Sequence, residues 1–328
     1  MRAFKSFEPN RAVGAACMAT LLAAVIWTPA LAAKPARSLS GSASGYVMQR
    51  QSGPSRTVVS TGAGTWVATF TDGARTVALA GPKRTFGEPT TTSATVTTSV
   101  WVRLLATPFT GSVNTTWLDH ARVDTGADVL ATAMQYIAGA PTISNSTGVR
   151  IAGDADYGPL QADGSRSAGA DFNDFLGVSW NYASGTVDAP EASELGALDC
   201  SGFMRMLFGY RGGVPLVLTP DGGKSLPRHS WEIAESGPGV VVIPNSGAQP
   251  SSRAALQAGD IVAFDASTTD GTRIDHVGMF LGRDSAGHDR FISSRITANG
   301  PTLGDLGGRS TLDGTGLYAL SFRSARRV

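Results

Sequence analysis

The sequence has few of the residues on which several large functional classes depend. Its 328 residues include four histidines, two cysteines and only 16% charged residues. So few cysteines and histidines exclude a cysteine-rich zinc module. Basic and acidic residues number 27 and 26, and a net charge of +1 argues against a nucleic-acid binder with a broad basic surface. No His, Asp and Cys residues occur at the spacing of metal ligands, and we therefore expect no metal and no cofactor.

Long apolar runs are also absent, with one exception at the start of the chain. Residues 1–33 begin with basic side chains, continue with an apolar run over 12–27 and end in the small residues of 30–33. This order predicts a secretory signal peptide. The apolar run is shorter than the roughly 20 residues that a membrane-spanning helix needs. We expect an exported protein with no stable membrane span after signal cleavage, and a retained N-terminal anchor is the alternative.

Removal of such a signal peptide would leave a single cysteine. Cys17 lies within the predicted signal peptide, and Cys200 would then enter an oxidising compartment without a partner in its own chain. An unpaired thiol in an exported protein has to be buried, paired between chains or used chemically. Cys200 is therefore the first candidate for a catalytic residue.

The residues around this cysteine predict a helix that begins beside it. Asp199 is a favourable N-cap, Gly209 is a favourable stop, and the apolar residues between them supply a buried face. In the first turn of a helix, unpaired backbone N–H groups and the positive end of the helix dipole favour a thiolate. The alternative is a cysteine that only fills the core.

A cysteine nucleophile needs an imidazole that accepts its proton. His120 lies at a domain junction, His229 lies in an irregular stretch, and His288 lies in a polar loop between two strands. His276 opens a strand in which alternation places Gly278 on the same face, and a glycine there leaves room for another group to approach. We interpret His276 as the general base.

Two regions separate the predicted signal peptide from these residues. Residues 34–56 have no helical period and are interpreted as a flexible tether. Residues 57–120 are rich in Thr, Val and Ser and predict a small, mainly β region, with strands near 65–70 and 96–102 and a turn at Asp72-Gly73. Anchoring the protein, covering a cleft and supporting folding are the three roles that its composition leaves open.

Residues 125–328 predict an α+β domain. Apolar residues recur at three- and four-residue spacing over 127–137, which predicts a helix that ends near Gly139. Residues 142–190 are rich in loops. Strands are predicted at 260–264, 276–281, 290–296 and 317–322.

Three short blocks stand out in this domain: Asp-Cys-Ser-Gly-Phe at 199–203, Leu-Gln-Ala-Gly-Asp-Ile-Val-Ala-Phe at 256–264 and Asp-His-Val-Gly-Met-Phe-Leu-Gly at 275–282. Their residues, order and spacing resemble the signature blocks of the NlpC/P60 family of cell-wall cysteine peptidases. The resemblance covers about residues 125–328, with apparent insertions near 142–175 and 212–224. It implies a papain-like domain, in which a nucleophile helix packs on an antiparallel sheet. It also implies hydrolysis of amide bonds in peptidoglycan stem peptides, commonly the bond from D-glutamate to the diamino acid.

The resemblance further implies roles for individual residues. Cys200 becomes the nucleophile and His276 the general base. Substrate contacts are implied for Tyr182 at the oxyanion site or substrate wall, for Asp199 and Ser201 at the free amine of the peptide, and for Arg228 in the segment after the nucleophile helix. Asp199 and Ser201 can fill these roles while they also cap and open the helix.

The residue that orients the histidine departs from the family's pattern. The family usually has His, Asn, Gln or Glu on the next strand, where the register of 290–296 places Ser293. A serine hydroxyl can accept the imidazole N–H but adds no charge that stabilises the imidazolium. His288, in the preceding loop, is the alternative third member.

Three functions remain open on these grounds. The first is a secreted, cell-wall associated cysteine hydrolase of peptidoglycan stem peptides. The second is a non-catalytic cell-wall binding protein that keeps the fold and has a degenerate triad. The third is another thiol amide enzyme, either an amidase or a transpeptidase. The expected partner is a wall polymer rather than a nucleic acid.

Overall fold

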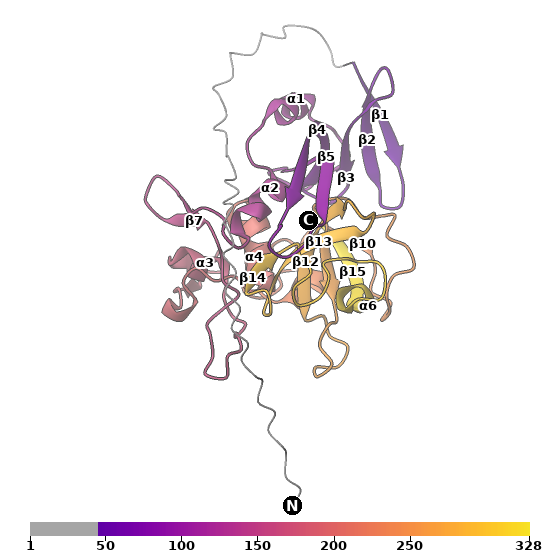
Figure 1. The fold of residues 1–328 in the computed structure, drawn as a ribbon. Helices are drawn as coiled ribbons and strands as arrows, with labels where there is room; N and C mark the ends of the chain where they lie inside the picture. Colours follow the sequence, from indigo (N-terminus) through magenta and orange to yellow (C-terminus); the bar gives the residue numbers. More distant parts are fainter. Residues whose placement is uncertain (1–44) are drawn as a thin grey trace, which may run out of the picture. The chain divides into compact units, whose positions relative to one another are not determined.

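Two large antiparallel sheets organise the part of the chain that the structure describes, which is residues 45–328 of the computed structural model (Figure 1). The first sheet has five strands and the second has six. The predicted signal peptide, with Cys17, lies outside the described residues, and so does most of the predicted tether.

The first sheet is a succession of hairpins in the order β1-β2-β3-β4-β5. Its elements are β1 (Tyr46–Gln51), β2 (Arg56–Thr61), β3 (Trp66–Thr71), β4 (Thr76–Gly87) and β5 (Thr95–Leu104), followed by helix α1 (Thr115–Val123). Alternating residues bury one face, where Val59, Phe70 and Leu79 form an apolar cluster with Leu118 of α1. The β-rich region is therefore confirmed, and a turn separates β3 from β4 at Asp72-Gly73, where Gly73 has a φ of 80°.

The predicted tether is wrong from residue 46 onward, because β1 forms the edge of the first sheet. β1 pairs antiparallel with β2, from Tyr46 opposite Thr61 to Gln51 opposite Arg56. The four central residues of β1 are exposed. An edge strand that buries so little apolar surface has no alternation from which it can be predicted.

The second sheet has the strand order β10-β15-β11-β12-β13-β14. The strands are β10 (Val240–Ile243), β11 (Ile261–Phe264), β12 (His276–Arg283), β13 (Asp289–Arg295), β14 (Gly300–Thr302) and β15 (Phe322–Arg327). β12 pairs with β11 on one side and with β13 on the other. The predicted strands over 260–264, 276–281 and 290–296 are thereby confirmed.

The second sheet has a helix against one of its faces. Helix α4 (Cys200–Met204) continues into a π-helical segment, Arg205–Tyr210, and packs on β12 and β13. Val277, Met279 and Leu281 share an apolar cluster with this helix, whereas Phe280 belongs to a second cluster. The alternation predicted for β12 is confirmed.

Shorter elements complete the fold. They are α2 (Val129–Ala133) with the 3-10 turn Met134–Tyr136, α3 (Phe172–Leu176), α5 (Ser230–Ser236), the hairpin of β6 (Ile143–Ser144) and β7 (Arg150–Ala152), the hairpin of β8 (Trp180–Asn181) and β9 (Val187–Asp188), and the 3-10 turn Ala192–Glu194. α2 and its 3-10 turn confirm the helix predicted over 127–137.

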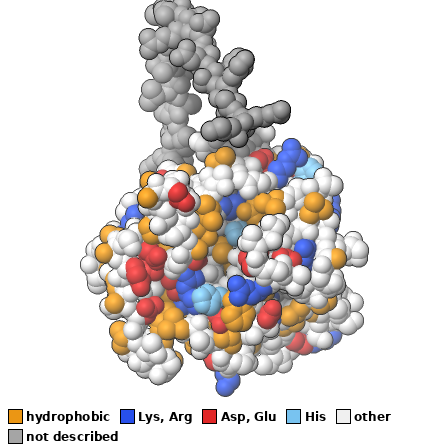
Figure 2. All heavy atoms as spheres, turned by 90° about the horizontal axis from the view of Figure 1, so that it is seen from below, with side chains coloured by type: hydrophobic (Ala, Val, Ile, Leu, Met, Phe, Trp, Pro, Cys, Tyr) orange, Lys and Arg blue, Asp and Glu red, His pale blue; other side chains and the backbone are white. Residues whose placement is uncertain are grey.

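Figure 2 shows basic and acidic side chains interspersed on one face of the molecule, without a large patch of one charge.

The predicted strand over 317–322 is wrong, because α6 (Leu317–Ser321) occupies most of it and β15 begins only at Phe322. Leu317 and Leu320 are 50% and 54% exposed, while Tyr318 and Ala319 between them are buried. Two adjacent buried residues do not alternate, and the three-residue spacing of the exposed leucines fits a helical turn.

A buried ion pair links the two sheets. Arg327 of β15 donates from Nε and Nη2 to the Asp260 carboxylate, at 2.8 Å each, and from Nη1 to Thr71 of β3, also at 2.8 Å. The Arg327 and Asp260 side chains are almost completely buried. The first sheet is thus fixed against the second by a charge that cannot reach water.

Asp260→Asn should lower the free energy of unfolding by about 3 kcal/mol, because it leaves the buried Arg327 charge without its counter-charge. The matched control is Asp72→Asn, which breaks the exposed pair with Arg50 and should change stability far less. Urea unfolding measures both variants. Equal, small losses would show that the buried pair does not hold the sheets together.

Candidate active site

Cys200 opens helix α4, as the sequence predicts. The Asp199 side chain accepts a hydrogen bond from the backbone N–H of Gly202 at 2.7 Å, so Asp199 is the N-cap. The helical segment ends at Tyr210, next to the predicted stop at Gly209. Cys200 is 6% exposed and is the only cysteine among the described residues.

The thiol lies against the beginning of β12. Its Sγ atom is 3.9 Å from the backbone oxygen of Asp275. The backbone N–H groups of Val277 and Ser201 also interact with the sulfur. Because Asp275 and Val277 flank His276 in the chain, the thiol lies beside the backbone that carries the predicted base.

Burial raises the pKa of the Cys200 thiol to about 12, and the negative charge of Asp199 acts in the same direction. The Val277 N–H and the positive charge of Arg228 lower this pKa by less. The prediction that the helix start favours a thiolate is therefore wrong for the resting state, because desolvation outweighs the effect of the helix N-terminus.

His276 is buried and packs against two aromatic rings. Its ring centroid lies 5.7 Å from that of Phe264 and 5.2 Å from that of Tyr318. Nε2 is buried and has no hydrogen-bond partner among the described residues. Burial, and then the positive charge of Arg295, lower the pKa of His276 to about 3. The resting groups are therefore a neutral thiol and a neutral imidazole.

Ser293 lies on the strand next to the base but is bonded elsewhere. A Cβ atom at Gly278 would lie 3.0 Å from the Cβ of Ser293, so the two strands approach closely here. The Ser293 hydroxyl oxygen accepts a hydrogen bond from Nε of Arg295 at 3.0 Å. The group expected to orient His276 is thus bonded to a cation.

His288 lies at the far end of the hairpin that β12 and β13 form. β12 begins at His276 and ends at Arg283, and an eight-residue strand spans more than about 20 Å. Nδ1 of His288 lies 2.9 Å from the carboxylate of Asp313. The register therefore rules out His288 as the third member of the triad.

Asp199, Ser201 and Arg228 form one hydrogen-bonded network beside the thiol. Arg228 donates to the Asp199 carboxylate at 2.8 Å and to the Ser201 hydroxyl at 2.6 Å, and Ser201 donates to Asp199 at 3.1 Å. Burial alone would raise the pKa of Asp199, but the charge of Arg228 and these hydrogen bonds hold it below its ordinary value. The network is therefore an ion pair at neutral pH.

These residues surround a cavity of about 330 Å³ that contains the thiol. The lining residues are Tyr157, Ala168, Gly169 and those of 199–201, 228–231 and 273–275. No residue of the first sheet is among them, so the β region does not cover this cavity.

Comparison with known protein families gives this arrangement a context. The model of the NlpC/P60 family matches residues 178–303, a stretch that includes Cys200, His276 and Ser293. Residues 178–303 form an NlpC/P60 domain. The family comprises cell-wall hydrolases, generally cysteine peptidases and amidases. A search of curated proteins found no match to the chain.

The NlpC/P60 domain holds Tyr182 away from the cavity. The Tyr182 hydroxyl accepts a hydrogen bond from Arg205 at 2.7 Å, and Arg205 in turn donates to Asp171 at 2.9 Å. Tyr157 lines the cavity instead; burial raises its pKa, and Cys200 acts in the same direction. Tyr157 comes from the loop-rich insertion, where no sequence pattern singled it out.

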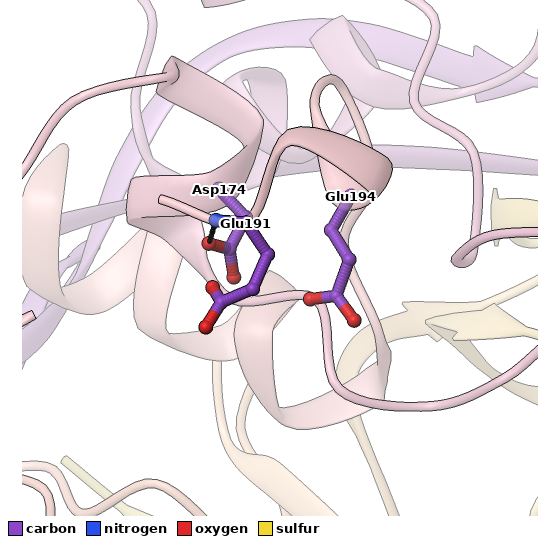
Figure 3. A group of neighbouring side chains, drawn as sticks. All are labelled: Asp174, Glu191 and Glu194. Atoms are coloured by element: carbon purple, nitrogen blue, oxygen red, sulfur yellow. Dashed lines mark hydrogen bonds between the residues drawn. The ribbon is translucent and has the colours of Figure 1, made fainter. Parts of the chain in front are cut away.

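Two groups of acidic side chains lie close enough to share a cation. Figure 3 shows the first group, which consists of Asp174, Glu191 and Glu194. The Asp174 carboxylate accepts hydrogen bonds from the backbone N–H groups of Asp171 and Glu191. Burial, and then the interaction with Glu191, raise the pKa of Asp174 to about 6. The second group consists of Asp265, Asp270 and Asp275.

In the described part of the chain, no helix combines the length and apolarity that crossing a membrane requires.

The reaction of Cys200 with iodoacetamide should accelerate about tenfold per pH unit between pH 7 and 10, because only the thiolate reacts and the pKa lies near 12. A short cysteine peptide serves as the control, since its rate should level off above its ordinary pKa of about 8.5. Peptide mass spectrometry follows the label. A rate that is constant between pH 7 and 8 would instead indicate a preformed thiolate–imidazolium pair.

Proposed function

We propose that this chain is an exported, cell-wall associated cysteine hydrolase of peptidoglycan stem peptides, and that it cleaves the bond from D-glutamate to the diamino acid. The observation that carries the proposal is the thiol of Cys200, which lies in a cavity at a helix start and against the strand that begins with His276. The packing of α4 on an antiparallel sheet supports a papain-like arrangement. The basic, apolar and small-residue order of 1–33 supports export.

In the proposed mechanism, the Cys200 proton leaves during the attack rather than before it. Because Nε2 of His276 is buried, we assign Nδ1 to the thiol. The sulfur electron pair forms a bond to the amide carbonyl carbon while the thiol proton moves to Nδ1 and the π pair of the C=O bond moves onto the oxygen. The oxygen then re-forms the carbonyl as the C–N bond breaks, and the proton moves from Nδ1 to the amine nitrogen. Water attacks the resulting thioester, gives one proton to Nδ1, and releases the acid as the thiol is restored.

Groups around the sulfur support these steps. The N–H groups of Val277 and Ser201 lower the pKa of the Cys200 thiol, so they assist the transfer of its proton to His276. A bound peptide displaces water from the cavity, and these interactions become stronger in the drier surroundings. We assign to Tyr157 the position at the substrate wall that the resemblance gave to Tyr182.

Mass spectrometry of purified peptidoglycan fragments tests this proposal. The wild-type protein should release fragments with new amine termini at the diamino acid. Cys200→Ala should keep its unfolding transition and lose cleavage, and cleavage at an unchanged rate would overturn the proposal. His276→Ala should lower kcat/KM by roughly 10²- to 10⁴-fold. Ser293→Ala should lower it by less than about tenfold, because this hydroxyl already accepts a bond from Arg295.

A wall-binding protein without turnover is the second candidate, and one observation favours it. Burial, and then the Arg295 charge, lower the pKa of the His276 imidazole, and its Nε2 has no hydrogen-bond partner among the described residues, so the imidazolium that turnover requires is disfavoured. A binding protein would be retained on isolated wall material to the same extent with or without Cys200. It would release no new amine termini.

A further inference from the structure

Two charged residues that line the cavity of Cys200, Asp199 and Arg228, are paired with each other. The Asp199 carboxylate accepts five hydrogen bonds. The donors are the N–H groups of Gly169 and Gly202, the Ser201 hydroxyl and, twice, the Arg228 guanidinium. Nε of Arg228 also lies 3.7 Å from the Asp171 carboxylate. An incoming ammonium group would therefore have to break this network in order to bind Asp199.

The other carboxylate of the lining is directed at a neighbouring loop. Oδ2 of Asp275 accepts the backbone N–H groups of Ala266 at 2.8 Å and of Ser267 at 2.7 Å. Neither of these two residues lines the cavity. Near the thiol, Asp275 contributes its backbone oxygen.

Arg273 also lines the cavity, and its guanidinium group is available to a ligand. It is exposed and forms no ion pair or side-chain hydrogen bond with the residues that the structure describes. His229, on the same lining, is also exposed, and its ring lies parallel to that of Trp231 with centroids 6.1 Å apart. The charge open to a ligand is thus a guanidinium, whose planar N–H groups bind a carboxylate through two parallel hydrogen bonds.

We infer that the cavity selects stem peptides with a free carboxylate next to the cleaved amide, and that Arg273 is the residue that recognises this carboxylate. The inference rests on the proposed function, because it takes a stem peptide as the ligand. Conversion of that carboxylate to a carboxamide keeps the shape of the peptide and removes the charge. Loss of the charge-assisted bonds should weaken binding about tenfold.

Calorimetric binding tests the inference with two synthetic stem peptides that differ only in carboxylate or carboxamide at the glutamyl residue. The protein carries Cys200→Ala, so that neither peptide is consumed. This variant should bind the carboxylate peptide about tenfold more tightly. Adding Arg273→Gln should reduce the difference to less than about twofold. The control Arg283→Gln, which changes an arginine 76% exposed at the far end of β12, should keep the tenfold difference.

Equal affinity for the two peptides, a preference that survives Arg273→Gln, or no measurable binding of either peptide overturns the inference. Cleavage by the wild-type protein is measured separately on the same peptides. A binding preference that depends on Arg273, without any cleavage, would contradict the proposed hydrolase and support the inference.

Discussion

The ion pair of Asp199 and Arg228 is the interaction on which the site depends. Asp199 caps α4 and so sets the position of Cys200, and Arg228 holds the segment after the helix against it. Arg228 also donates to the backbone oxygen of Gly169 and thereby fixes another segment of the cavity lining. The side chains of Arg228 and Asp199 are only 13% and 7% exposed, so loss of either partner would leave a buried charge, which costs several kcal/mol.

The same burial determines the protonation of the reactive groups. Burial of the two side chains favours their neutral forms, so Cys200 is held as a thiol and His276 as an imidazole. Cysteine sites that work as preformed thiolates instead place a cation or an imidazolium next to sulfur. Here burial and Asp199 raise the thiol pKa by more than the Arg228 cation lowers it, and Arg295 lowers the pKa of His276 in addition to burial. In the proposed mechanism, proton transfer therefore accompanies the attack on the substrate.

Local sequence patterns predicted the helix and the strand that carry Cys200 and His276. An N-cap and a stop defined the helix of Cys200, and alternation defined the strand of His276. Arg295 was also within reach of this reasoning, because it lies two residues after Ser293 and so shares its face of β13. The raised thiol pKa was not, because it depends on burial by segments that are distant in the chain.

The fold, too, contains elements that the sequence patterns predicted and elements that they did not. The strands β3, β5, β11, β12 and β13 were predicted, whereas β1, which buries little, and α6, where an exposed and a buried face alternate over only five residues, were not. Tyr157 and Arg273 reach the cavity from irregular loops, whose course depends on tertiary contacts rather than on periodicity. The sequence thus predicted residues that line the cavity from patterned segments, namely Asp199, Cys200, Ser201 and Arg228, and missed Tyr157 and Arg273.

A stem peptide that ends in a chloromethyl ketone at the cleaved position tests the central claim most directly, because its carbonyl carbon takes the place of the amide carbon beside the sulfur. Tryptic mass spectrometry should find one adduct, on Cys200. Excess unmodified peptide should prevent the adduct, and His276→Ala should slow its formation while leaving the fold intact. An adduct on another residue, or an adduct on Cys200 that excess peptide does not prevent, would contradict the account.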